Sequence, residues 1–276
     1  MSSSFYWSLP FLQPAPSGEA PRTKVALIVL NQPFSKPLLH RLWHASDWRC
    51  CADGGANRLH DLLSGADDRP TSYVARLLAW FIQSRRTEAD EYLPDLLKGD
   101  LDSLRDDVKQ FYEARGVPVV KDGDQYSTDL AKCVRSLEEK EQSDGVDTPY
   151  DVVLLGSLSG RLDHIIHVLA SLHKLRQSGR RIFAVTDDNV GWVLDEGKHH
   201  ISIDHSILGP TCGLLPVGVD STVLTTTGLR WNLTNETSGF GGLISTSNHL
   251  VPEEDTVFVE TSRPIWWVAE LRRENL

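Results

Sequence analysis

The sequence is short of cysteine, of positive charge and of long hydrophobic runs, and each shortage excludes a class of protein. Its four cysteines are spaced neither like a zinc site nor like a secreted disulfide framework, so we expect reduced thiols. Asp and Glu outnumber Lys and Arg by 38 to 28, which argues against a nucleic-acid-binding surface. The sequence contains no apolar run long enough to span a membrane, and residues 1–23 do not resemble a signal peptide. We therefore expect a cytoplasmic protein with neither a nucleic-acid nor a membrane partner.

The first part of the chain alternates apolar runs with segments of helical periodicity. The apolar runs are typical of parallel strands covered on both faces, and they lie at 24–30, 48–52, 94–97, 117–121, 150–155 and 181–186. Helices are predicted at 37–45, 56–63, 73–82, 103–115 and 130–141, with another that follows residue 164 and reaches about 177. This alternation predicts an α/β domain with a doubly wound, mostly parallel sheet.

The pattern changes near residues 187–190, after which short strands follow one another with glycine or proline turns. They are predicted at 192–194, 199–203, 211–216, 221–227, 242–247 and 256–260. Short strands without helical periodicity are typical of a β-sandwich or barrel. We therefore expect a flexible arm over 1–23, an α/β domain over 24–188 and a β-sandwich domain over 189–276.

Two aspartates directly follow the predicted strand at 94–97. Asp100 and Asp102 lie on the turn that leads from this strand into a helix, and Asp129 begins a later helix. Ligands of open α/β sheets bind at the carboxyl ends of strands, and clustered carboxylates there suit Mg²⁺. The alternative is that these aspartates are solvated or cap helices, since a short acidic motif alone is weak.

Two further turns carry groups that suit phosphate. Asp53 opens a glycine turn whose backbone amides can cradle a phosphate or ribose, although a plain tight turn explains the same residues. Arg161 follows the strand at 150–155, and its planar fork makes bidentate contacts to phosphate, with Asp163 placed to orient it. A Walker A sequence is absent, which argues against a P-loop kinase.

Six motifs, taken together and in order, resemble the thiamin pyrophosphokinase family. They are CADGGAN (51–57), GDLDS (99–103), DQYSTD (124–129), GRLDH (160–164), TTTGLRWNL (225–233) and STSN (245–248). The resemblance implies transfer of a pyrophosphoryl group from ATP to thiamin, with AMP released and Mg²⁺ required. It also implies a homodimer of two-domain subunits whose active site lies at the subunit interface.

The resemblance also implies roles for individual residues. Asp100, Asp102 and Asp129 would surround Mg²⁺ and the polyphosphate, and Arg161 would face the phosphates. Thiamin carries a cationic ring that suits an aromatic face, which either Trp231 or Trp267 could supply. The remaining assignments are Asp53, Gly54, Gly55, Asn57, Gln125, Thr128 and Asp163 for the nucleotide side, and Ser245 and Asn248 for thiamin.

Two other functions use the same residues. One is a thiamin- or nucleotide-binding regulator that has lost catalysis, and the other is a metal-dependent phosphohydrolase. The intact carboxylates and Arg161 argue against the first. A β-domain that carries Trp231 and the STSN segment argues against the second.

Overall fold

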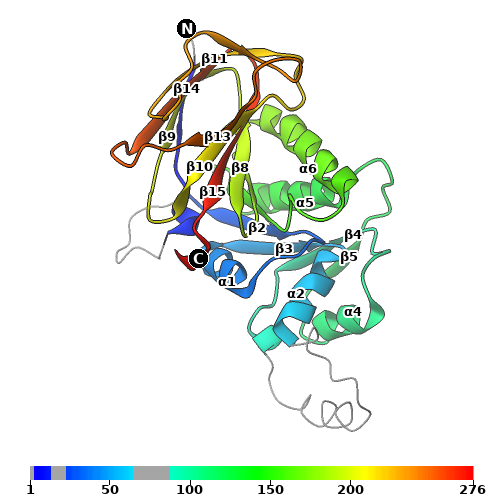
Figure 1. Cartoon of the computed structure of the whole chain (residues 1–276). Helices are drawn as coiled ribbons and strands as arrows, with labels where there is room; N and C mark the ends of the chain where they lie inside the picture. The colour runs from blue at the N-terminus through cyan, green and yellow to red at the C-terminus, as the bar shows by residue number, and fades with distance from the viewer. Residues whose placement is uncertain (1–2, 14–22, 65–87, 276) are drawn as a thin grey trace. The chain divides into compact units, whose positions relative to one another are not determined.

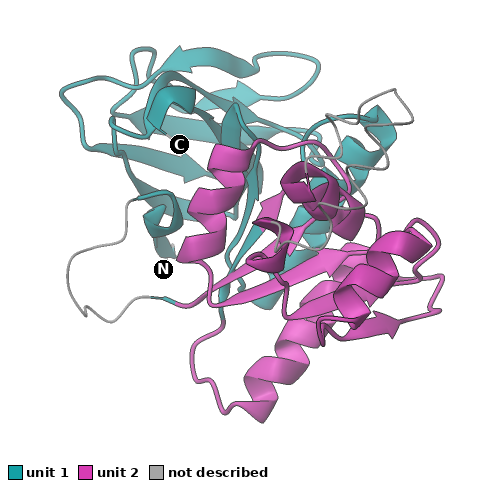
Figure 2. Ribbon diagram, turned by 90° about the horizontal axis from the view of Figure 1, so that it is seen from below, with its two compact units in different colours: residues 1–23, 150–153, 157–276 teal, residues 24–149, 154–156 magenta. Residues whose placement is uncertain are grey.

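The computed structural model describes residues 3–13, 23–64 and 88–275. The chain divides into two compact units, shown in Figure 1 and coloured separately in Figure 2. We call residues 24–149 and 154–156 the α/β unit, and residues 1–23, 150–153 and 157–276 the β unit. Among the described residues, no helix has both the length and the apolarity needed to cross a bilayer.

The α/β unit is built on parallel strands in the order β2-β3-β4-β5. These are β2 (Val25–Val29), β3 (Trp48–Ala52), β4 (Leu96–Gly99) and β5 (Val119–Lys121), and β6 (Asp151–Leu155) contributes residues to both units. The helices are α1 (Lys36–Ala45), α2 (Gly55–Ser64), α4 (Asp106–Glu113) and α5 (Asp129–Ser143), with a 3-10 turn at Glu88–Asp90. In Figure 1, α5 lies on one face of these strands, and α1 and α2 lie on the other. Every residue of β2 is buried, as expected for a strand covered on both faces.

The β unit contains two runs of paired strands and one long helix. One run is β1-β9-β14-β11-β12 and the other is β13-β10-β15-β8-β7. The first comprises β1 (Ser4–Trp7), β9 (Gly197–Ser202), β14 (Thr256–Thr261), β11 (Thr222–Thr227) and β12 (Glu236–Ser238). The second comprises β13 (Ser245–His249), β10 (Leu208–Leu215), β15 (Ile265–Leu271), β8 (Asn189–Leu194) and β7 (Ile182–Val185), and the helix is α6 (Leu162–Leu175). The prediction of a parallel α/β part followed by a strand-rich part is confirmed.

Two features differ from the sequence-based expectations, and one expectation is not tested. The compact β unit includes α6 and β7, although we expected both in the α/β domain. The strand β7 pairs antiparallel with β8, which joins it to the strands of the β unit. The strands β12 and β15 were not expected. The predicted helix at 73–82 lies outside the described residues.

The expectation of a loosely held arm was wrong for the first described residues. Residues Ser4–Trp7 form β1, which pairs parallel with β9, and Phe11 is buried just beyond it. Aromatic packing explains the difference, because Phe5 stacks on the His199 ring with centroids 4.8 Å apart. The indole Nε1 of Trp7 also donates a hydrogen bond to His199 Nδ1 at 3.0 Å. Aromatic side chains therefore anchor this segment, although it is rich in serine and proline.

This contact predicts an acid-sensitive stability. Because Nδ1 of buried His199 accepts from Trp7, its Nε2 carries the proton and donates to the Asp195 carbonyl at 2.8 Å. Burial lowers the pKa of His199, although the bond to Asp195 opposes this. As the pH drops, the His199 imidazole of the unfolded chain is therefore protonated before that of the folded chain. The free energy of unfolding consequently falls below a pH of about 6.5, the ordinary histidine value. We expect the melting temperature of His199→Gln to depend less on pH between about 7 and 5 than that of the wild type. Equal slopes for the two proteins would contradict this assignment.

Candidate active site

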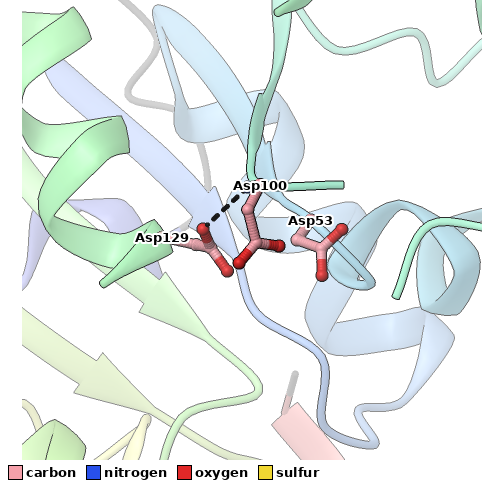
Figure 3. A group of neighbouring side chains, drawn as sticks. All are labelled: Asp53, Asp100 and Asp129. Carbon is pink, nitrogen blue, oxygen red and sulfur yellow. Dashed lines mark hydrogen bonds between the residues drawn. The ribbon is translucent and has the colours of Figure 1, made fainter. Parts of the chain in front are cut away.

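Three aspartates from three elements of the α/β unit converge at one edge of its parallel strands. Asp53 follows β3, Asp100 follows β4, and Asp129 is the first residue of α5. One carboxylate oxygen of each lies within 4.8 Å of the other two, and Figure 3 shows the three side chains close together. Because β3 and β4 are adjacent and parallel, their carboxyl ends meet at the same edge, where ligands of open α/β sheets bind. We call these three residues the aspartate cluster.

Backbone hydrogen bonds fix the loop after β4 around this cluster. The N–H of Asp100 donates to Asp129 Oδ1, and the N–H of Ser103 donates to Asp53 Oδ2, both at 3.2 Å. Asp53 and Leu101 adopt positive φ angles of 43° and 63°, which residues other than glycine rarely do. Such conformations are found preferentially at functional sites, so the backbone and the carboxylates indicate the same location.

The carboxyl group of Asp53 has the properties of a cation ligand. Its Oδ1 is buried and makes no hydrogen bond within the described residues. Burial raises the pKa of Asp53, hydrogen bonds from Ser103 oppose this, and the charge of Asp129 raises the pKa further. A buried carboxylate oxygen without a partner is costly unless a cation or a proton satisfies it. Oxygen ligands at a strand end fit Mg²⁺, which binds through a few carboxylates, substrate phosphates and water.

Asp102 lies beside the cluster and is not part of it. Its N–H donates to Asp100 Oδ1 at 3.2 Å, and its own Oδ1 accepts from the Ser103 hydroxyl at 3.0 Å. The sequence suggested Asp100, Asp102 and Asp129 as the metal ligands, whereas the structure groups Asp53 with the first and last of these. The positive φ of the intervening Leu101 turns the chain between Asp100 and Asp102. Asp102 therefore remains exposed at the rim of the cluster.

The glycine turn after β3 has a clear packing role. A Cβ atom on Gly55 would lie 2.2 Å from the carbonyl oxygen of Val29, so only glycine lets the start of α2 approach β2 this closely. A Cβ atom on Gly54 would lie 2.3 Å from Asn31 Nδ2. Both predicted nucleotide-side glycines therefore set the position of the Asp53 turn.

Two polar side chains predicted on the nucleotide side also hold the loops in place. Asn57 donates from Nδ2 to the Ser103 carbonyl at 2.7 Å and accepts the Arg105 N–H at 3.1 Å. Thr128 caps α5, because its Oγ1 accepts the backbone N–H three residues later at 3.2 Å. Gln125 is exposed on the loop that precedes α5. Asn57 and Thr128 thus shape the loops on either side of the aspartate cluster.

Arg161 and Asp163 lie at the start of α6 in the β unit. Arg161 donates from Nε and Nη2 to the two carboxylate oxygens of Asp163, at 3.1 and 2.6 Å. Both side chains are exposed. The orienting contact expected from the sequence is therefore present, and it fixes the plane of a guanidinium that is open to solvent.

The four residues predicted for thiamin lie in the β unit and divide into different environments. Asn248 accepts the Trp231 N–H at 3.2 Å and donates to the Trp231 carbonyl at 2.9 Å, so it fixes the backbone that carries this indole. Ser245 is buried and accepts from Asn248 Nδ2 at 3.3 Å. Trp231 is 52% exposed, whereas Trp267 is 0% exposed and packs near Trp192. Of the two predicted aromatic faces, only that of Trp231 is open in this chain.

Sequence reasoning missed one charged residue beside the aspartate cluster. The side chain of Lys132, on α5, is 1% exposed, and its Nζ donates to Asp129 Oδ1 at 3.0 Å. The available signal was a lysine three residues after an aspartate on a helix, a spacing at which side chains meet. That spacing is common on solvated helix surfaces, so it did not indicate a buried cation.

A glycine substitution tests the geometry of the cluster. A Cβ atom on Gly99 would lie 2.8 Å from Asp53 Cβ and 3.1 Å from Asp129 Oδ1, so Gly99→Ala must push these carboxylates apart. Displacement of about 1 Å at an active site can cost about 10²-fold in rate, and we expect a loss of that order with the fold retained. Gly123→Ala is the control, since nothing lies within 4 Å of its added Cβ. Equal steady-state turnover of the two variants would show that the cluster geometry is unimportant.

Comparisons with known proteins show the family of this chain. A family model described as "Thiamin pyrophosphokinase, catalytic domain" matches residues 39–184, and one described as "Thiamin pyrophosphokinase, vitamin B1 binding domain" matches residues 198–266. Thiamine pyrophosphokinase 3 of Oryza sativa subsp. japonica is 40% identical, covering 91% of this chain and 88% of that protein. The crystal structure of yeast thiamin pyrophosphokinase superposes with a TM-score of 0.76 at 25% identity, covering 99% of this chain and 92% of the other. This chain belongs to the thiamin pyrophosphokinase family.

Proposed function

We propose that the chain transfers the pyrophosphoryl group of ATP to the hydroxyl group of thiamin, giving thiamin diphosphate and AMP. The observation that carries this proposal is the aspartate cluster, in which oxygens from three elements lie within 4.8 Å of one another. Family membership supplies the substrates, because the related proteins of rice and of Saccharomyces cerevisiae are named thiamine pyrophosphokinases.

The reaction needs charge neutralisation and positioning more than covalent catalysis. The thiamin hydroxyl oxygen bonds to the β-phosphorus while the bond from that phosphorus to the α–β bridging oxygen breaks. The hydroxyl proton is released, and AMP leaves with the electron pair of the broken bond. Asp53, Asp100 and Asp129 would hold Mg²⁺, which when bound neutralises phosphate charge. Asp102, exposed at the rim, would face the polyphosphate.

Residues of the β unit would bind the two substrates. The guanidinium of Arg161, oriented by Asp163, offers a planar fork that matches phosphate oxygens. The open indole of Trp231 would face the thiazolium ring of thiamin. The Trp231 ring already has a cation nearby, since the Arg230 guanidinium lies 4.8 Å from the centroid of this ring. Asn248 would act on thiamin indirectly, because both of its amide atoms bond to the Trp231 backbone.

We further propose that the protein works as a homodimer with its active site at the subunit interface. Two apolar residues of α6 support this, since Leu162 is 71% exposed and Ile166 is 54% exposed beside Arg161. A second copy that covered this face would bury both side chains and exclude water near the arginine. In one dilution series, the fraction of dimer measured by sedimentation and the turnover per subunit should decrease together. A fully active monomer would rule out the interface model.

One assay separates the proposed activity from its rivals. Purified protein with ATP, Mg²⁺ and thiamin should yield thiamin diphosphate and AMP in equal amounts. A phosphohydrolase would release phosphate or pyrophosphate from ATP without thiamin. A regulator would bind thiamin or ATP without forming either product.

A further inference from the structure

Lys132 is a buried cation whose side chain is directed at the aspartate cluster. It lies on α5, one turn after Asp129, and its side chain is 1% exposed. Burying an ammonium group is costly unless it is paired and hydrogen-bonded. Its hydrogen bond to Asp129 Oδ1 is 3.0 Å long, and Asp129 itself is only partly exposed. This pair therefore differs from the solvated ion pairs usual on helix surfaces, which contribute little to stability.

The two hydrogen bonds that Asp129 accepts both fall on the same carboxylate oxygen. Within the described residues, Lys132 Nζ and the Asp100 N–H both donate to the same oxygen, Oδ1. The other oxygen, Oδ2, is thereby left for a metal ion. Because the Asp100 N–H comes from the end of β4, the same atom links α5 to the neighbouring strand.

Charge around the ammonium supports the same view. Three carboxylates surround Lys132 with negative charge, namely Asp129, which it contacts, and Asp100 and Asp122. These carboxylates include two members of the aspartate cluster. Lys98 Nζ lies 3.5 Å from Asp122, whereas Lys132 Nζ lies 3.0 Å from Asp129, a member of the cluster.

We propose that Lys132 is a positioning residue, which orients Asp129 for Mg²⁺ and offsets the charge of the aspartate cluster while no metal is bound. The inference rests on the proposed function for the identity of the metal ion. It concerns metal binding and stability, so it can be tested without thiamin or ATP.

The test compares Lys132→Met with Lys140→Met, the same change on the same helix. Lys140 pairs with Asp144 at 2.7 Å, but both of these side chains are far more exposed. We expect Lys132→Met to lower the melting temperature in EDTA by roughly 5–10 °C, because one partner of a buried pair is removed. Saturating Mg²⁺ should recover at least half of this loss, since the metal replaces the missing positive charge. Lys140→Met should shift the melting temperature by about 2 °C or less, equally with and without Mg²⁺.

A purely structural role makes a different prediction. If Lys132 only packs and pairs within α5, its loss should cost the same stability in EDTA and in Mg²⁺, and that result would overturn the proposal. Turnover adds a second readout, because a displaced Asp129 should lower kcat while leaving the thiamin KM unchanged. Failure to form thiamin diphosphate in the wild type would overturn the proposed function but leave the Mg²⁺-dependent stability difference in place.

A double variant keeps the test decisive if Lys132→Met does not fold. Asp129→Asn combined with Lys132→Met removes both charges of the pair, so no unpaired carboxylate remains at this position. We expect the double variant to melt higher in EDTA than Lys132→Met, or to fold where that variant does not. It should also gain less stability from Mg²⁺ than Lys132→Met does. A double variant no more stable than Lys132→Met would contradict the proposal.

Discussion

Asp100→Asn is expected to lower kcat by about 10²-fold or more while leaving the fold intact, the scale seen when one electrostatic stabiliser is removed. Asparagine keeps the shape of the side chain and removes the charge that would bind Mg²⁺. Asp100 lies at a strand end and is not in the hydrophobic core, so its side chain contributes little packing. Turnover should be measured as thiamin diphosphate formed across a Mg²⁺ titration, with the melting temperature recorded for the same sample.

Asp106→Asn provides the matched control for this charge change. Asp106 is an exposed acid in the first turn of α4 and takes no part in the aspartate cluster. We expect its variant to keep nearly normal turnover and the same Mg²⁺ dependence as the wild type. If Asp100→Asn behaved in the same way as this control, the metal assignment would be wrong.

The convergence of Asp100 and Asp129 could be predicted from the sequence because it follows from topology. Both residues come after apolar runs that read as parallel strands, and the carboxyl ends of such strands share one edge. The membership of Asp53 was harder to predict. Its motif reads as a glycine turn, and only the pairing of β3 with β4 places its side chain beside Asp100.

Other features depend on packing that no local pattern expresses. The N-terminal strand is short and flanked by polar residues, and its stability comes from contacts with His199, far away in the sequence. Lys132 carries the spacing of an ordinary surface ion pair, so its burial becomes clear only when α5 is packed. Trp267 is buried within β15, whereas Trp231 lies on a bend that follows β11 and is exposed. Local composition does not separate the two, because both lie in apolar or mixed stretches.

The two tryptophans should respond differently to the same substitution. Trp267 is enclosed in the β unit, so Trp267→Leu leaves a cavity and should cost on the order of 3 kcal/mol of unfolding free energy. Its thiamin KM should stay close to the wild-type value. Urea unfolding followed by circular dichroism measures the first quantity, and steady-state kinetics measure the second.

Trp231→Leu should instead show a selective effect on thiamin. A cation over an indole face contributes roughly 0.5 to 2 kcal/mol, so the thiamin KM should rise by about two- to thirtyfold. The ATP KM should change little, because Arg161 and the aspartate cluster would hold the nucleotide. Loss of a half-exposed ring removes little packing, so stability should remain near that of the wild type. Fluorescence quenching by thiamin should disappear in this variant and persist in Trp267→Leu. Unchanged thiamin KM in Trp231→Leu would mean that another group contacts the thiazolium ring, since Trp267 offers no open face.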